Sequence, residues 1–329
     1  MRKPLALLAI IGGLALGGAA GGQDKPPVDR NVLHVQVILD HLGFSPGILD
    51  GRPGQSLTTA LRGFQETRGL AETGEIDQPT LRALYPYRGW RPTKTLRVSA
   101  AVVQGPFAPL PKDAAEQAKL PALGYASAEE KLAEKFHTTP EVLASLNPGA
   151  QFVAGARLVF PNALPTSRTY PAALKPEWRA TLNDLNVTAD VPLADHIVVD
   201  ESDGVLRVFD AADTLVAQFS ATMGSEHDPL PIGTWKIVSV DTNPKFRYNP
   251  DLFWDAKPSD REVMLPAGPN GPVGVVWLGL DKPHYGIHGT PEPQTIGRTE
   301  SHGCIRLTNW DAARLALMVR TGTPAIFQE

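Results

Sequence analysis

Cys304 is the single cysteine of this 329-residue chain, with His302 two positions before it and Arg306 two positions after it. A lone cysteine cannot close an intramolecular disulfide, so it is a buried hydrophobic residue, an intermolecular link or a reactive thiol. A thiol of ordinary pKa is only a few per cent thiolate near neutral pH, so a nucleophilic cysteine needs a base within reach. His302 and His288 are both candidate bases, and the residue types alone leave the choice open.

The surroundings of the two histidines differ. Tyr285 and Ile287 alternate in a strand-like segment that Gly289 ends, which places His288 at the end of a rigid element. The glycine between His302 and the cysteine, Gly303, predicts a turn, and it lets the backbone approach a substrate closely. The N–H groups of residues 303 and 304 could stabilise the oxyanion that develops in acyl transfer.

A metal site is the competing chemistry for this cluster. His284, His288, His302 and Cys304 are all residue types that bind zinc, but their spacing is not a chelating pattern. We therefore expect no metal and a structural hydrogen bond for His284. Arg306 either binds a substrate carboxylate through its two-pronged donor set or forms a surface salt bridge.

The elements that must position these residues belong to a chain too long for one ordinary domain, and about 150 residues per domain predicts two or three. Hydrophobic residues make up 42% and charged residues 20%, which indicates a globular protein. The net charge of −4 supplies no basic field, so we expect no nucleic-acid partner.

Residues 1–20 predict a signal peptide, because two cations precede an apolar run and small residues follow it. The alternative is an uncleaved membrane anchor, since the apolar stretch is of borderline length for a span. Either route exports the protein to a compartment that permits disulfides, so its one thiol needs another reason to be present.

Residues 31–86 predict three short helices separated by glycine turns, with Asp77 as the cap of the third helix. Their apolar positions form a small core. The turn and core residues that carry a resemblance are Leu42-Gly43-Phe44, Asp50-Gly51, Phe64-Gln65, Gly69-Leu70, Thr73-Gly74 and Thr80-Leu81. Through them the segment resembles the three-helix peptidoglycan-binding module, which implies affinity for the cell wall.

Residues 95–162 predict a small α+β module. Leu132 and Phe136 share a helix face, a further helix begins at Thr139-Pro140, and "ARLVF" near the end is a short strand. The segment resembles a degenerate LysM module, a strand–helix–helix–strand unit that binds aminosugar chains, and a structural spacer is the alternative. We expect a proline-containing linker over residues 163–192.

Strand signals dominate residues 194–328, and regular short strands with glycine turns favour a mostly β sandwich or barrel. One convincing helix follows the cysteine, over residues 309–319. The connection over residues 243–260 is long and aromatic, so we expect it to act as a lid over the site. The expected protein is multidomain: a small all-α three-helix domain, a small α+β module and a mostly β sandwich catalytic domain with one helix.

The cysteine motif carries a third resemblance. His288 stands sixteen positions before Cys304, and the run Ser301-His302-Gly303-Cys304 is intact. The wider pattern includes "VLRVFD", "SATMG", "PIGTW", "WLGL" and "YGIHGT". Together these segments make residues 194–328 similar to the L,D-transpeptidases with a YkuD-type catalytic domain.

The resemblance implies a role for each residue of the motif. Cys304 is the nucleophile, His288 the general base, and the carbonyl of Gly289 orients the imidazole. Gly303 and His302 line the oxyanion pocket. A stem peptide is bound through Arg306, Tyr285 and Ser301.

The implied reaction needs no cofactor. The thiolate attacks the amide after the third residue of a tetrapeptide stem, normally meso-diaminopimelate, releases D-alanine, and passes the acyl group from a thioester to an amine. The implied partners are peptidoglycan, a wall-attached outer-membrane protein as a further acceptor, and carbapenems as covalent inhibitors, in a periplasmic or cell-wall location. Two alternatives stay open: an L,D-carboxypeptidase with water as acceptor, and a non-catalytic wall-binding protein.

Overall fold

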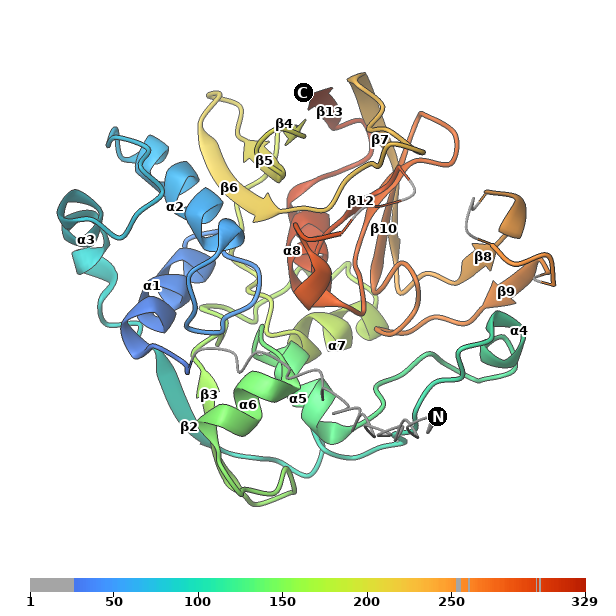
Figure 1. Ribbon diagram of the computed structural model, residues 1–329, viewed down its shortest axis with the longest axis horizontal. Coiled ribbons are helices and arrows are strands. Elements are labelled where there is room, and N and C mark those ends of the chain that lie inside the picture. Colours follow the sequence, from blue (N-terminus) through green and yellow to red (C-terminus); the bar gives the residue numbers. More distant parts are fainter. Residues whose placement is uncertain (1–26, 253–255, 260, 300, 302) are drawn as a thin grey trace, which may run out of the picture.

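The computed structural model describes residues 27–252, 256–259, 261–299, 301 and 303–329. Three N-terminal helices lie beside the edge of a large sheet, and a small middle module lies below that sheet and its helix α8 (Figure 1). The expected signal peptide, residues 1–20, falls outside the described residues. Among the helices that are described, none is long and apolar enough to cross a membrane.

The described elements follow one another from an all-helical start to a strand-rich end. The helices are α1 (Arg30–His41), α2 (Gln55–Thr67), α3 (Gln78–Leu84), η1 (Tyr85–Tyr87), α4 (Ala114–Gln117), α5 (Ala128–Lys135), α6 (Pro140–Leu146), α7 (Pro176–Asp184), η2 (Pro250–Leu252), η3 (Pro293–Thr295) and α8 (Asn309–Met318). The strands are β1 (Phe44–Ser45), β2 (Thr93–Arg97), β3 (Arg157–Pro161), β4 (His196–Asp200), β5 (Val205–Phe209), β6 (Leu215–Ser220), β7 (Gly233–Thr242), β8 (Phe246–Tyr248), β9 (Val263–Leu265), β10 (Val276–Leu280), β11 (Gly286–His288), β12 (Ile305–Arg306) and β13 (Pro324–Gln328).

The N-terminal domain contains the three expected helices, α1 to α3. Asp29 caps α1 by accepting hydrogen bonds from the backbone of its first turn, and Asp77 caps α3 by accepting from Thr80 N. Leu61 and Phe64 of α2 are almost wholly buried in the core that the helices share. Side-chain caps and apolar spacing therefore account for this domain locally.

The middle module joins an antiparallel strand pair, β2 and β3, to helices α5 and α6. Ser127 and Thr139 cap the two helices through their hydroxyls, and Phe136 stacks on Phe160 of β3 in the module's core. The order of β2, α5, α6 and β3 is strand, helix, helix, strand, with the short α4 inserted after β2. Glycan binding by this module stays a prediction.

The C-terminal domain is built on a nine-stranded mixed sheet in the order β1-β6-β5-β4-β13-β7-β10-β11-β12. Helix α8 packs against β10 and β11 (Figure 1), and Trp310, Ala313 and Leu315 on this helix are fully buried. The sheet curls around this helix, because Thr222 just beyond β6 bridges to Arg306 of β12 on the far side. A mostly β domain with one late helix agrees with the expectation from strand periodicity.

The segment 163–192 differs from the expected linker. It contains α7, in which Trp178 and Leu182 are buried in the main hydrophobic core. Pro176 occupies the first turn of this helix, where proline is favoured because its missing N–H has no intrahelical partner. In the sequence, the helical spacing of Trp178 and Leu182 was the local sign that this segment packs against the core.

The N-terminal domain adds a strand to the large nine-stranded sheet. β1 pairs in parallel with β6, so Phe44 lies opposite Gln218 and Ser45 opposite Phe219. The Gln218 side chain donates from Nε2 to the carbonyl of Thr59 in α2 over 2.7 Å. The two domains are therefore joined by backbone pairing and side-chain contacts across the interface.

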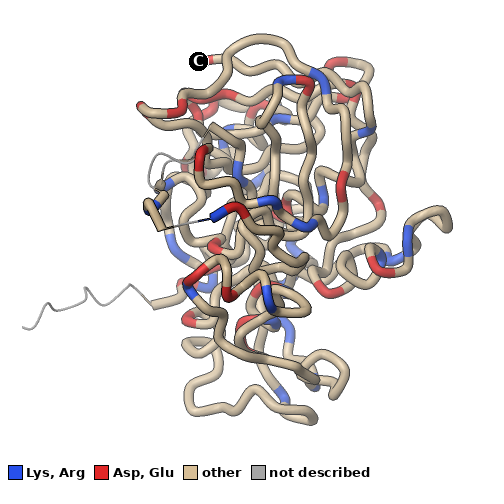
Figure 2. Tube along the Cα trace, turned by 90° about the vertical axis from the view of Figure 1, so that its right-hand side faces the viewer, with Lys and Arg blue, Asp and Glu red and all other residues tan. Residues whose placement is uncertain are grey.

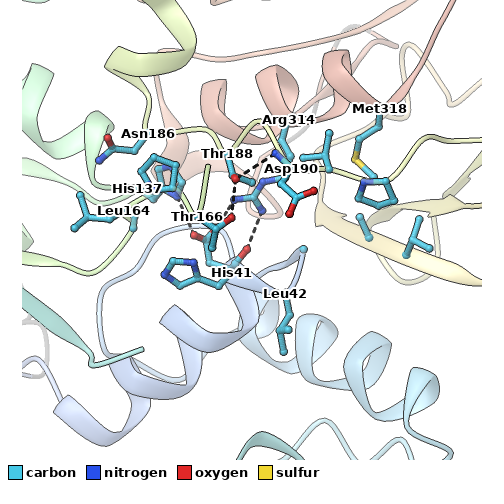
Figure 3. A pocket seen from close by; sticks show the side chains of 18 residues that line it. His41, Leu42, His137, Leu164, Thr166, Asn186, Thr188, Asp190, Arg314 and Met318 are labelled. Carbon is cyan, nitrogen blue, oxygen red and sulfur yellow. Dashed lines mark hydrogen bonds and ion pairs between the residues drawn. The ribbon is translucent and has the colours of Figure 1, made fainter. Parts of the chain in front are cut away.

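A buried ionic cluster joins all three parts of the chain. Asp40 at the end of α1 contacts His137 Nδ1 and Arg314 Nη2 of α8, each at 3.1 Å, and all three side chains are buried. Figure 3 shows His137 and Arg314 beside the small cavity, about 70 Å³, that lies between these elements. Burial raises the pKa of Asp40, but the charge of Arg314 and the contacts with His137 outweigh it and hold that pKa well below its ordinary value.

Charged residues outside this cluster are of mixed sign. Figure 2 shows Lys and Arg interspersed with Asp and Glu along the trace. Alternating signs give little long-range field, in keeping with a net charge of −4.

Candidate active site

Cys304 and His288 come from two neighbouring parallel strands. In the pair β11–β12, Ile287 lies opposite Ile305 and His288 lies opposite Arg306. The two isoleucines are fully buried, and successive side chains of a strand point to opposite faces, so His288 and Arg306 share the other face. Cys304 directly precedes β12, so the thiol stands at the start of the strand that pairs with the strand of His288.

The His288 imidazole is buried and held in one tautomer. Its Nδ1 lies 2.7 Å from the carbonyl oxygen of Gly289, and because a carbonyl only accepts, Nδ1 carries the proton and Nε2 has the free lone pair. Trp277 of β10 stacks on the imidazole with ring centroids 5.6 Å apart. Burial lowers the pKa of His288 to about 4, and the nearby charge of Arg306 acts in the same direction. The imidazole is thus a neutral, oriented base at neutral pH.

The Cys304 thiol is protonated in the resting site. Burial raises the pKa of Cys304 to about 11, against the opposing effects of a backbone hydrogen bond from Gly286 and the charge of Arg306. Its Sγ lies 3.7 Å from the carbonyl of His284, a weak contact of the thiol with an acceptor. The resting pair is therefore thiol and neutral imidazole, and proton transfer must accompany attack on a substrate.

Position 303 requires glycine for two reasons: its backbone conformation and the closeness of the Tyr285 ring. Its φ is +84°, in the left-handed region that favours glycine. A Cβ placed there would lie 2.7 Å from Cε1 of Tyr285. Tyr285 is half-buried, and the Nζ of Lys282 lies 4.7 Å from its ring centroid. Glycine therefore allows the aromatic ring to pack directly on the turn that carries the thiol.

The remaining predicted site residues are Ser301, Arg306 and His302, and the structure treats each of them differently. Ser301 is buried, and its Oγ donates to the carbonyl of Cys304 over 2.6 Å, so in the structure it shapes the turn; its contact with a stem peptide stays a prediction. The backbone of Arg306 exchanges hydrogen bonds with Thr222 in both directions, which fixes the start of its side chain beside the thiol. His302 lies outside the described residues.

Sequence reasoning missed Asn309, the first residue of α8. It is fully buried, and its Oδ1 accepts a hydrogen bond from Val275 N at 3.1 Å. A Cβ on Gly289 would lie 2.2 Å from that Oδ1, so the amide packs directly on the backbone that orients His288. A first-turn asparagine after a capping threonine is usually a solvent-facing residue, so nothing in the sequence pattern signalled this contact.

The predicted lid borders the site only in part. Residues 253–255 and 260 lie outside the described residues, while β8 pairs with β9 in a separate two-stranded sheet. A hollow of about 480 Å³ lies between the start of this segment and Trp277, whose ring stacks on His288. A covering role for residues 243–260 stays a prediction.

Within the described part of the chain, no group of three or more His, Cys, Asp or Glu side chains is arranged to hold a metal ion. The groups described near the thiol are the neutral, oriented imidazole of His288 and the guanidinium of Arg306. That set suits acyl transfer.

Two family models match this chain. Residues 194–327 match the model described as the L,D-transpeptidase catalytic domain, YkuD, and residues 29–84 match the model of a putative peptidoglycan binding domain. The two matches fall on two of the three segments in which the sequence alone showed a resemblance.

Two curated relatives and one solved structure illustrate what the chain is similar to. A putative L,D-transpeptidase YkuD of Bacillus licheniformis is 29% identical over 197 residues, which make up 59% of this chain and 89% of that protein. The protein of the same name from Bacillus subtilis is 54% identical over 55 residues, 17% of this chain and 34% of that protein. A solved L,D-transpeptidase from Mycobacterium smegmatis is 21% identical with a TM-score of 0.33, covering 40% of this chain and 58% of that one. The chain thus spans most of the first relative and a smaller share of the other two.

Proposed function

Since the chain carries an L,D-transpeptidase catalytic domain of the YkuD type behind a peptidoglycan-binding domain, we propose that it transfers acyl groups between peptidoglycan stem peptides through Cys304. The observation that carries the proposal is the oriented, neutral imidazole of His288 in β11, the strand that pairs with β12 directly after the thiol. A buried thiol of raised pKa is inert without such a base.

In the first half-reaction, Cys304 Sγ attacks the carbonyl carbon of the amide after the third residue of a tetrapeptide stem. Nε2 of His288 takes the thiol proton, and the N–H groups of Gly303 and Cys304 stabilise the oxyanion. When the C–N bond breaks, the imidazolium returns the proton to the leaving amine. D-Alanine departs and a thioester remains on the enzyme.

In the second half-reaction, an amine of a neighbouring stem attacks the thioester carbonyl. His288 takes the amine proton and delivers it to the departing sulfur, so the neutral pair is restored and a new amide is formed. Arg306 and Tyr285 border the thiol, and we assign them the donor stem's carboxylate. A wall-attached outer-membrane protein could serve as a further amine acceptor, and the protein would act in the periplasm or at the cell wall.

A carbapenem is an acyl donor of the same kind, because its strained lactam carbonyl accepts a thiol nucleophile. We propose that it acylates Cys304 without turnover. The intact mass of the wild-type protein should rise by one inhibitor molecule, and Cys304→Ala should not change in mass.

The reaction is tested by mass spectrometry of the mature protein incubated with a disaccharide-tetrapeptide of the diaminopimelate type, beside Cys304→Ala. A cross-linked dimer formed only by the wild type supports the transpeptidase. Tripeptide without dimer would assign water as the acceptor and make the protein a carboxypeptidase. Unchanged substrate would leave a wall-binding protein without this chemistry.

A further inference from the structure

A buried carboxyl of the middle module reaches the N-terminus of α8. Glu134, near the end of α5, is buried, and its Oε1 accepts a hydrogen bond from Asn309 Nδ2 over 2.7 Å. These two residues are 175 positions apart in the chain. The proposed chemistry does not use Glu134, although it contacts a residue that packs on the active site.

Asn309 is held by hydrogen bonds on both ends of its amide. Nδ2 also donates to the carbonyl of Pro269 over 3.0 Å, and Oδ1 accepts from Val275 N. The amide is wedged between two glycines, since a Cβ would lie 1.8 Å from Oδ1 at Gly274 and 2.2 Å from it at Gly289. The amide therefore packs directly against the backbone of Gly289.

Gly289 is the residue whose carbonyl accepts the Nδ1 proton of His288 over 2.7 Å. A chain of direct contacts thus runs from Glu134 through Asn309 and Gly289 to the imidazole. The second carboxyl oxygen of Glu134 accepts from the Tyr125 hydroxyl over 2.5 Å, which fixes the plane of the carboxyl group.

We propose that Glu134 is a positioning residue for the transferase reaction: through Asn309 it holds the Gly289 carbonyl against the proton on His288 Nδ1. The middle module would then complete the active site as well as join the two flanking domains. This inference rests on the proposed function for its kinetic consequence, but its structural claim concerns only the hydrogen bond to His288.

What the proposal requires of Glu134 is reach and an acceptor oxygen, not charge. Burial raises the pKa of Glu134 to about 7, partly offset by the hydrogen bonds from Tyr125 and Asn309. A neutral side chain of the same length should therefore serve nearly as well. A charged side chain one methylene shorter should not.

The test compares Glu134→Gln with Glu134→Asp in the full-length protein. The glutamine keeps the acceptor at the same distance, and we expect it to retain at least half of kcat for D-alanine release. The aspartate withdraws the acceptor, and we expect kcat to fall on the order of tenfold with little change in KM. Glu129→Asp and Glu129→Gln on the same helix are the matched controls and should behave as the wild type.

A readout independent of turnover is the ¹H–¹⁵N signal of His288 Nδ1–H in ¹⁵N-histidine-labelled protein, assigned by its absence from His288→Gln. In Glu134→Asp this proton should exchange faster with water and its resonance should move upfield, whereas in Glu134→Gln it should stay in place. If Glu134→Asp does not fold, Asn309→Ser, which lacks the amide that reaches Glu134, carries the same expectation.

Equal losses in the aspartate and glutamine variants would overturn the proposal, because charge rather than reach would then matter. An unchanged Nδ1–H signal in a folded Glu134→Asp protein would overturn it as well. If no variant, nor the wild type, turned over the tetrapeptide, the proposed function would fail while the change in the Nδ1–H signal would still uphold the positioning contact.

Discussion

At the scale of single residues, the Cys304 thiol and the His288 imidazole are both uncharged rather than a thiolate–imidazolium ion pair. Burial acts in opposite directions on the two groups, lowering the pKa of His288 to about 4 and raising that of Cys304 to about 11. Both groups are thereby kept uncharged across the physiological range. In the proposed function, the neutral imidazole is the base, and the thiol becomes nucleophilic only as it loses its proton to that base.

The first prediction concerns pH. The raised pKa of Cys304 predicts that alkylation by iodoacetamide is slow at pH 7 and rises with pH toward a midpoint near 11. Because the charge of Arg306 lowers that pKa, Arg306→Gln should raise it and slow alkylation at pH 9. Rate constants measured by intact mass check this, and a wild-type midpoint near pH 7 would contradict it.

The acid limb of the turnover profile follows from the same pair. A base with a lowered pKa stays neutral until the pH falls to its folded value, so kcat/KM should hold down to about pH 4 and fall below it. An acid limb at pH 6.5, the ordinary value for histidine, would show that burial does not control the base.

A second residue-scale prediction concerns the turn glycine. Gly303→Ala should lower kcat/KM on the order of a hundredfold, because a Cβ displaces the Tyr285 ring and the N–H groups that stabilise the oxyanion. Gly322→Ala is a matched control, since Gly322 also has a positive φ, +96°, but no atom within 4 Å of its Cβ position. The control should lose about 1–2 kcal/mol of stability with unchanged kcat/KM, and equal kinetic losses would refute the explanation.

At the scale of elements, the ends of helices and strands do most of the positioning. β11 and β12 place His288 opposite Arg306, two residues after the thiol, and the first residue of α8 supports the backbone after β11. Further along α8, Arg314 reaches back to the end of α1 through Asp40. The first residue of α8 thus packs on the active site, and Arg314 in its second turn binds the N-terminal domain through Asp40.

The element-scale prediction is that Arg314→Met destabilises the protein by about 3–5 kcal/mol, because it leaves the Asp40 carboxylate buried without its cation. Arg320→Met, an exposed position just beyond the same helix, should change stability by about 0.5 kcal/mol or less. Denaturant unfolding followed by circular dichroism measures both. A similar loss of unfolding free energy in the two variants would mean that the buried Asp40–Arg314 pair does not contribute more to stability than an exposed arginine.

At the scale of the whole molecule, the three parts form one structure through polar contacts as well as apolar cores. β1 extends the catalytic sheet, Asp40, His137 and Arg314 meet at the centre, and Glu134 joins the middle module to α8. In the proposed function, a peptidoglycan strand bound to an N-terminal domain fixed in this way would lie at a set distance from the thiol. That geometry suits an enzyme that acts on a polymer.

The whole-molecule prediction concerns how stability depends on pH through Glu134, which joins the middle module to α8. Its folded pKa, about 7, lies above its ordinary value of 4.5, so the stability it contributes is present at low pH and is lost as the pH rises from 4.5 through 7. Glu134→Gln has no proton to lose, so it should be more stable relative to the wild type at pH 8 than at pH 5, by up to about 3 kcal/mol. Thermal melts at the two pH values check the difference, and a constant offset would contradict the raised pKa.

The sequence by itself determined those features whose causes are local. The one cysteine, its flanking glycine and the strand-end histidine indicated acyl transfer, and the caps Asp77 and Thr139 marked helix starts that the structure reproduces. Capping, turn geometry and apolar periodicity act over a few residues, so a short stretch of sequence contains all of the information.

Only the tertiary structure decided the rest. The pairing of β1 with β6, the burial of α7 and the contact of Glu134 with Asn309 join residues far apart in sequence, and no local pattern specifies such a partner. The protonation state of the pair has the same origin, because it depends on how much of the folded chain surrounds the thiol and the imidazole and excludes water from them.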